Sequence, residues 1–254
     1  MKEKIITYID IGILSVSSFV TSALTAVVGA GGGTALIAIM LQIMHPSIAI
    51  PIHGIQQLSS NTTRVLLFWK DMSWPIIFRF SLLMPIGVWM GLKVFQELPV
   101  EIIQILIGSF ILFSLIIQQI GRNRNKDFPY WGFYPLGLIT GALNMLVGVI
   151  APILGVLVIR KELSKESIVG TLGFFGFIGN LLKIIGFTIV GFSFMKYSLA
   201  IICVIPSGII GTYVGRVGLS KLNEKYFLIL FRIVLILLAI KLITIDGLKL
   251  HNLI

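Results

Sequence analysis

The sequence predicts an all-α, polytopic membrane helix bundle of about eight spans, built from two duplicated four-span halves. Three observations predict this fold. The 254-residue chain is 57% hydrophobic and only 12% charged, with a mean hydropathy of +1.03. Apolar stretches near the roughly 20 residues that cross a bilayer recur along almost the whole chain. The second half of the chain also matches the first half, faintly but in order.

Composition excludes most other classes of protein. Soluble domains carry about 25% charged residues, and a soluble fold of this composition would leave a large aggregating surface. The net charge is +10, but the basic residues are scattered, so we expect a lipid bilayer as partner and no nucleic acid. Cys203 is the single cysteine, which excludes a disulfide framework and a CxxC-type metal site.

The internal match has an offset of 119 residues and pairs Gly54 with Gly173, Asn61 with Asn180 and Arg64 with Lys183. Beyond these positions the offset grows by a few residues. Other matched residues are Thr21, Ala23, Leu24, Val28 and Gly29 with Thr140, Ala142, Leu143, Val147 and Gly148, and Pro85 and Gly87 with Pro206 and Gly208. Because such repeats are typical of secondary transporters, we expect one transporter domain over residues 1–254. Its repeats lie at about 5–120 and 131–246, joined by a linker at 121–130.

Each repeat contains five apolar runs, of which the second is too short to span. In the first repeat the runs are 5–28, 34–44, 47–69, 73–95 and 100–120. In the second they are 132–147, 152–159, 167–191, 197–215 and 227–245. A helix of 11 residues rises about 17 Å, against a hydrocarbon core near 30 Å. Helix breakers precede both short runs, namely the glycine-rich segment 29–33 and the pair Gly148 and Pro152. We therefore expect a broken first element followed by three full spans in each repeat.

The loop charges leave the orientation of the repeats open. Four crossings per repeat would make the repeats parallel and place the basic residues near 2–4 and 122–126 on one side, as the positive-inside rule favours. Arg160, Lys161 and Lys165 would then face outward, against the rule. Separate crossings of the short runs would instead make the repeats inverted.

Charges within the apolar runs have one sign. Arg64, Arg79, Lys183 and Arg232 lie inside runs, whereas carboxylates other than Asp10 lie at run ends or in loops. Arg79, Arg232 and Lys241 lie nearer run ends, where snorkelling to the interface is an equally good interpretation. Buried cations without carboxylates indicate an anionic ligand, because charges inside a membrane are costly and tend to be functional.

Polar residues form a stripe around Arg64. His53, Gln57, Ser60, Asn61 and Arg64 fall on one helical face, which must point toward other helices or water. A hydrogen-bonded seam between helices without a ligand is the alternative. The equivalent face of the second repeat carries Gly176, Gly179, Asn180 and Lys183.

The glycine-rich break supplies a second feature of an anion site. A helix that begins at Thr34 presents free backbone N–H groups, and Pro152 marks the equivalent start in the second repeat. The predicted substrate-binding residues are Arg64, Lys183, Asn61, Asn180, Ser60, Gln57, His53, Gly31, Gly32, Gly33 and Thr34. We expect no catalytic residues, no metal and no cofactor. The glycine pairs Gly87 and Gly91, Gly137 and Gly141, and Gly211 and Gly215 are interpreted as helix-packing residues.

These segments resemble the TauE/SafE family of sulfite and organosulfur anion exporters. The resemblance rests on GAGGGTALI from Gly29, HGIQQLSSNTTR from His53 to Arg64, and GTLGFFGFIGNLLK from Gly170 to Lys183, and it covers nearly the full chain. It implies a multi-pass protein of the bacterial plasma membrane that exports small anions, such as sulfite or organosulfonates. The second repeat departs from the glycine-rich pattern with VIAP at Val149 to Pro152.

Two other functions stay open at this point. A membrane-embedded enzyme acting on a lipid or prenyl phosphate would also use buried cations, but HExxH, GxSxG, Walker A and paired carboxylates are absent from the sequence. An anion channel would differ from a transporter in its flux rate and its lack of coupling. The sequence favours a transporter and not an enzyme, and it leaves a homo-oligomer open.

Overall fold

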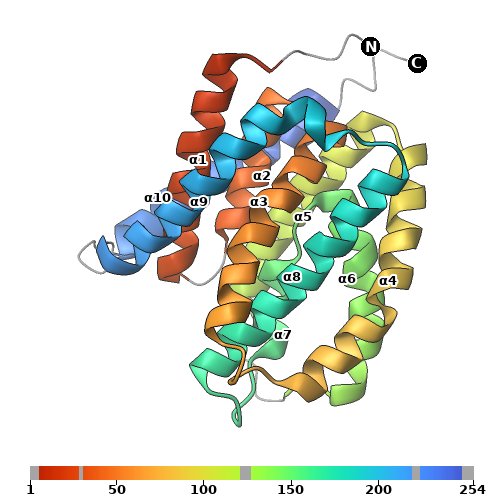
Figure 1. Cartoon of the computed structure of the whole chain (residues 1–254), viewed down its shortest axis with the longest axis vertical. Coiled ribbons are helices and arrows are strands. Elements are labelled where there is room, and N and C mark those ends of the chain that lie inside the picture. Colours follow the sequence, from red (N-terminus) through yellow and green to blue (C-terminus); the bar gives the residue numbers. More distant parts are fainter. Residues whose placement is uncertain (1–5, 29–30, 121–126, 219–223, 248–254) are drawn as a thin grey trace.

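The computed structural model describes residues 6–28, 31–120, 127–218 and 224–247 (Figure 1). Within these residues every regular element is helical, which confirms the predicted all-α class. The predicted linker at 121–130 lies partly outside the described residues. The basic residues near 2–4 and 122–126 lie wholly outside them. The helices are α1 (Tyr8–Val28), α2 (Gly32–Ile43), α3 (Pro46–Leu67), α4 (Trp74–Glu97), α5 (Val100–Ile120), α6 (Phe133–Val147), α7 (Ala151–Val158), α8 (Lys165–Ile189), α9 (Ser198–Gly218) and α10 (Glu224–Lys241). Short turns of other helical types occur at Tyr130–Gly132, Phe194–Tyr197 and Leu242–Gly247.

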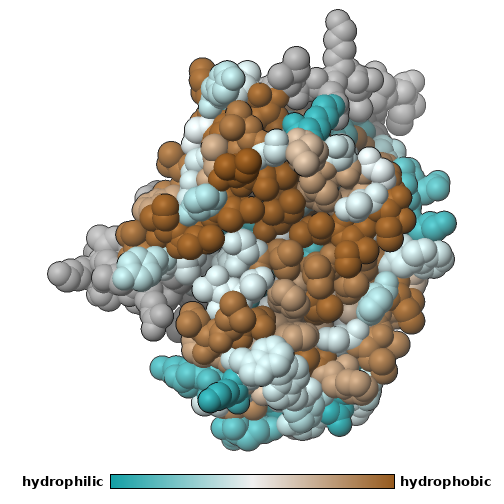
Figure 2. Space-filling model, in the orientation of Figure 1, coloured by the Kyte–Doolittle hydropathy of each residue, from teal (hydrophilic) through white to brown (hydrophobic). Residues whose placement is uncertain are grey.

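The surface is that of a membrane protein. In the described part of the chain five helices, α1, α4, α5, α8 and α9, are long and apolar enough to cross a bilayer. Large hydrophobic side chains such as Trp89, Ile202 and Tyr213 are exposed on them. Figure 2 shows hydrophobic residues over the middle of the visible face, with hydrophilic residues toward its lower end and along its upper right edge. These observations confirm the predicted polytopic membrane protein.

The first predicted break is a reversal of the chain. Gly31 ends the break with a φ of 102° and precedes α2. Gly32 then lies against the Thr21 backbone and the Thr25 side chain in the late turns of α1, so closely that a Cβ at this position would overlap the Thr21 carbonyl oxygen. α2 therefore returns along α1 instead of continuing it, and its residues Leu36, Ile37 and Ala38 are fully buried.

The second repeat contains the equivalent helical hairpin. Gly148 ends α6 with a φ of +80°, and α7 follows from Ala151. After α7, the Arg160 guanidinium Nη1 donates to the Phe128 carbonyl oxygen at 2.6 Å, just before α6 begins. Arg160 also stacks 4.0 Å over the Tyr130 ring and lowers the pKa of the Glu162 carboxyl, whose Oε1 accepts from Arg160 Nε at 2.6 Å. Arg160 thus joins the segment after α7 to the segment before α6 at the base of this hairpin.

Helices α3 and α8 cross in opposite directions at the centre of the molecule. Gly54 lies against Lys183, and Arg64 lies against Gly173, so numbers rise along α3 as they fall along α8. The two helices carry the matched pairs Asn61 with Asn180 and Arg64 with Lys183. Of the two arrangements that the sequence leaves open, antiparallel packing of equivalent helices is the inverted one.

The glycine pairs pack helices together, as predicted. Gly87 and Gly91 of α4 lie on the backbone of Leu138 and Ala142 in α6, and Gly211 and Gly215 of α9 lie on Phe19 and Ala23 in α1. Leu138 and Ala142 follow Phe19 and Ala23 by 119 residues, so the two interfaces are equivalent. These contacts make Gly211 the structural counterpart of Gly87. The sequence match had paired Gly87 with Gly208, which lies three residues earlier, and that pairing is wrong. Gly208 instead packs against Gln56, Ser18 and Ser22.

Candidate functional site

The tips of the two hairpins meet at a partly open cavity of about 60 Å³ between α3 and α8. Such a volume holds a few water molecules or one small ligand and falls far below the roughly 300–1,000 Å³ of pockets for drug-sized molecules. Its lining residues are Thr25, Gly31, Gly33, Thr34, His53, Gln57, Asn61, Arg64, Asn144, Gly148, Val149, Ile150, Ala151, Leu154, Leu172, Phe175, Gly176 and Asn180.

Most of the predicted site residues line this cavity. Eight of the eleven do so, namely Gly31, Gly33, Thr34, His53, Gln57, Asn61, Arg64 and Asn180. The remaining three lie behind the wall. Gly32 packs against α1, Ser60 is within 3.5 Å of Arg64 Nη2, and Lys183 is fully buried beside the cavity.

Arg64 brings the positive charge into the cavity. Its half-buried guanidinium makes one weak hydrogen bond, to Ser60 Oγ at 3.5 Å, so most of its five N–H donors are available to a ligand. Asn61, one turn earlier and 5% exposed, makes no side-chain hydrogen bond among the described residues. No carboxylate is among the described lining residues, so nothing there neutralises Arg64.

Lys183 is held by two neutral acceptors that belong to the cavity wall. Its Nζ donates to the Gly148 carbonyl oxygen at 2.7 Å and to Asn180 Oδ1 at 3.1 Å. The ammonium therefore ties the tip of the second hairpin to α8. The Lys183 ammonium does not line the cavity. Its two acceptors, Gly148 and Asn180, lie between it and the cavity.

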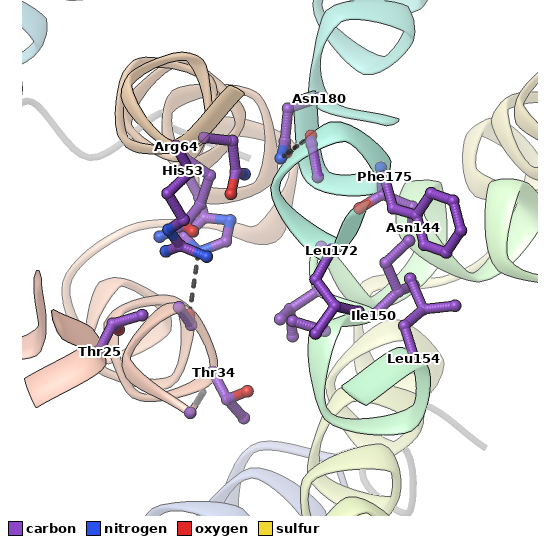
Figure 3. A pocket seen from close by; sticks show the side chains of 18 residues that line it. Thr25, Thr34, His53, Arg64, Asn144, Ile150, Leu154, Leu172, Phe175 and Asn180 are labelled. Carbon is purple, nitrogen blue, oxygen red and sulfur yellow. Dashed lines mark hydrogen bonds between the residues drawn. The ribbon is translucent and has the colours of Figure 1, made fainter. Parts of the chain in front are cut away.

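His53 ties the first hairpin to α3 in a similar way. Its Nε2 lies 2.9 Å from the Gly33 carbonyl oxygen, and because a carbonyl only accepts, Nε2 carries the proton (Figure 3). Nδ1 is buried and makes no hydrogen bond of good geometry among the described residues, although the Gly148 carbonyl interacts with the ring. Each hairpin tip is thus held to the long helix of its own half through a backbone carbonyl.

Two helix N-termini open onto the cavity. α2 begins at Gly32 and α7 at Ala151, and neither start has a side-chain cap. The first intrahelical backbone bonds reach back to Gly31 and Ile150, which leaves the N–H groups of residues 32–34 available at α2 but only that of Ala151 at α7, because Pro152 has no N–H. The Thr34 hydroxyl, 2% exposed, also has no partner among the described residues. Free N–H groups and helix dipoles at such starts favour an anion.

The cavity also contains residues that the sequence analysis did not predict, and the offset of 119 applied to predicted residues leads to three of them, Ile150, Leu172 and Gly176. Thr25 and Asn144 are one matched pair in the wall, and Asn61 and Asn180 are another. Gly31 with Ile150, His53 with Leu172, and Gln57 with Gly176 complete five such pairs. The second-half members are mostly apolar, so a search for polar groups passed over them. Figure 3 shows the result, with Arg64, His53 and Thr34 on one side and Leu172, Phe175 and Ile150 on the other.

The remaining intramembrane cations lie elsewhere. Arg79 Nη1 donates to the Pro75 carbonyl oxygen at 2.6 Å, and its guanidinium stands 5.3 Å from the Tyr130 ring. Lys241 Nζ bonds to Gln42 and lies 3.4 Å from Asp246 Oδ2. Neither is part of the cavity wall.

Comparison with known proteins gives one match. A family model described as "Sulfite exporter TauE/SafE" matches residues 14–242, which is most of the chain. No curated protein and no solved structure matches it.

Proposed function

The chain belongs to the TauE/SafE family of transporters, and from this premise we propose that it exports sulfite or a small organosulfonate through the cavity between the hairpin tips. It is a multi-pass membrane protein of the cell membrane and not an enzyme. The observation that carries the proposal is the Arg64 guanidinium, which lines a small cavity between two uncapped helix N-termini with no carboxylate in the described wall.

Each part of the wall has a task in this proposal. Arg64 pairs with the oxyanion through its planar donors, which suit such groups well. The Asn61 amide and the Thr34 hydroxyl add donors, and the amides of Gly31 to Thr34 close the shell. Lys183 and Asn180 support the wall from α8, and Lys183 adds positive potential from behind Gly148. His53 and Ser60 hold Gly33 and Arg64 in place.

Cavity size supports a small anion over a lipid or prenyl phosphate. A cavity of about 60 Å³ is too small to hold an acyl or prenyl chain inside it. An enzyme acting on such a substrate would also need a general base or a metal, and among the described residues no group of three His, Cys, Asp or Glu side chains gathers to hold one.

The hairpins give the proposal a transport mechanism. One hairpin is formed by α1 and α2 of the first half, and the other by α6 and α7 of the second half. The central helices of these halves, α3 and α8, are antiparallel. We propose that one half moves against the other, so that the anion site opens to one side of the membrane at a time, as in other transporters with inverted repeats.

Flux of labelled sulfite in proteoliposomes tests this function. The wild type should show saturable flux and counterflow, whereas Arg64→Gln should lower sulfite affinity by about ten-fold or more, because a charge-assisted hydrogen bond is worth roughly 1.5–3 kcal/mol. The matched control is Thr62→Val, since the Thr62 hydroxyl only donates to Leu58 of its own helix at 2.7 Å. Wild-type flux in Arg64→Gln would remove Arg64 from the site. Flux without saturation or counterflow would indicate a channel.

A further inference from the structure

Three side-chain amides in the cavity wall each donate one N–H of their NH₂ group to an acceptor of the protein itself. Asn144 Nδ2 donates to the Gly179 carbonyl oxygen at 2.9 Å, and Asn180 Nδ2 donates to the Gly176 carbonyl oxygen at 2.7 Å. A carbonyl only accepts, so the orientation of both amides is fixed. Gln57 Nε2 donates to Gln56 Oε1 at 2.7 Å.

The orientation of Gln57 follows from a chain of bonds that leads away from the cavity. The Ser18 hydroxyl donates to the Val204 carbonyl oxygen at 2.9 Å, so its oxygen accepts from Gln56 Nε2 at 3.3 Å. Gln56 Nε2 also lies 3.0 Å from Ser22 Oγ. With its NH₂ group engaged by two hydroxyls, Gln56 can offer only Oε1 to Gln57, and Gln57 must donate to it.

These orientations fix the three amide oxygens as acceptors, while each NH₂ group keeps its second N–H. Asn180 Oδ1 accepts from Lys183, whereas Gln57 Oε1 and Asn144 Oδ1 make no hydrogen bond with any described residue. The same wall carries Arg64 and the Thr34 hydroxyl (Figure 3). The cavity thus combines one cation and several donors with two amide oxygens that need a donor.

An anion without hydrogen-bond donors fits this combination poorly. It would satisfy Arg64 but bring its own lone pairs against the two amide oxygens, which would also lose any water they bind. Leaving a buried acceptor unsatisfied corresponds to roughly a 5- to 150-fold loss of affinity. A ligand that offers an O–H or N–H group to these oxygens avoids this loss.

We propose that the cavity selects oxyanions that also carry a hydrogen-bond donor, whether a hydroxyl, an ammonium or an acid proton, over donor-free anions of the same shape. The oxyanion lies toward Arg64, and the donor bonds to one of the two amide oxygens, Gln57 Oε1 of α3 or Asn144 Oδ1 of α6. Singly protonated sulfite belongs to the selected class, and the sulfite dianion does not. The inference rests on the anion site proposed above and adds its specificity.

Competition with labelled sulfite in proteoliposomes of the full chain tests the selection at one fixed pH. Two pairs of competitors differ mainly in a donor, namely isethionate with ethanesulfonate and hydrogen phosphate with sulfate. The donor-bearing member of a pair should compete at a concentration at least about ten-fold lower. Equal competition within the pairs, or no competition by any of the four anions, would overturn the inference while sulfite flux leaves the transporter standing. Absent sulfite flux would overturn the anion site itself before any competitor is added.

Gln57→Met then separates specificity from stability. The thioether keeps the length of the side chain without the acceptor, so ethanesulfonate should compete better than in the wild type and the ratio within the pair should fall below about three-fold. General damage to the site would weaken both competitors together and preserve the ratio. Thr62→Val, on the same helix outside the wall, should keep the wild-type ratio. An unchanged ratio in folded Gln57→Met would overturn the role of the Gln57 oxygen.

Discussion

Arg64 and Lys183 occupy matched positions in the two halves but meet the cavity differently. The Arg64 guanidinium lines it with one weak hydrogen bond, whereas the Lys183 ammonium is fully buried and bonded to Gly148 and Asn180. The sequence suggested equal roles for the two cations. In the structure, the first is free to bind a ligand and the second fastens the wall.

This difference predicts that substitution of Lys183 lowers mainly stability, whereas substitution of Arg64 lowers mainly sulfite affinity. Lys183→Met removes the donor of two buried acceptors, so the free energy of unfolding should fall by about 1–3 kcal/mol. Arg64→Gln gives up only the 3.5 Å bond to Ser60, so its stability should stay near the wild type while sulfite affinity falls. Thermal unfolding in detergent, measured beside sulfite flux, checks both. A Lys183→Met protein as stable as the wild type would contradict the fastening role.

At the scale of elements, the hairpin tips depend on single glycines. Gly148 has a φ of +80°, and a Cβ there would meet Ile37 at 3.4 Å, an ordinary contact. Any penalty at this position is therefore conformational. Gly155, in the same hairpin within α7, has open space around a Cβ and helical backbone. The two positions form a matched pair for substitution by alanine.

Gly148→Ala should destabilise the protein by about 1–2 kcal/mol, because an L-residue in the left-handed region is strained. Gly155→Ala should be neutral or stabilising by up to about 1 kcal/mol, because alanine favours the helix. Flux should fall in the first variant, since the strained residue carries the carbonyl that Lys183 holds, and stay unchanged in the second. Equal unfolding temperatures for both variants would show that the tip does not require its left-handed glycine.

Sequence patterns predicted where the helices begin and end better than they predicted where the chain reverses direction. The breaks at 29–33 and Gly148, the short runs after them and the polar face of α3 were all visible as departures from apolar sequence. α3 is 22 residues long, yet this polar face keeps it outside the set of apolar candidate spans. The reversal at Gly31 was not visible, because a glycine-rich break permits a kink or a turn equally. Only the contact of Gly32 with Thr21 decides between them.

The same limit applies to the site. Polar residues on one helical face were enough to find His53, Gln57, Asn61 and Arg64. Leu172 and Phe175 carry no chemical signal, and they enter the wall only because α8 crosses α3 in the opposite direction. Asn144 lies in an apolar helix, and its counterpart Thr25 was not a predicted site residue either, so the repeat could not point to it.

The whole molecule is organised around the crossing of α3 and α8. If the halves are inverted, matched loops must face opposite sides of the membrane, whereas parallel halves would place them on one side. The loop after α3 contains Asp71, and the matched loop after α8 contains Ser193, both exposed. Cys203→Ser removes the native cysteine and gives a background for single labels at these two positions.

Asp71→Cys and Ser193→Cys in that background should differ in intact cells. A membrane-impermeant maleimide should label one of them, and the other should react only after the membrane is made permeable. Because α3 and α8 run antiparallel with Arg64 against Gly173, the two loops lie at opposite ends of the bundle (Figure 1). Labelling of both positions from the outside would be incompatible with inverted halves. It would also argue against alternating access at one anion site. Alternating access in this mechanism requires the two hairpins to enter the membrane from opposite faces.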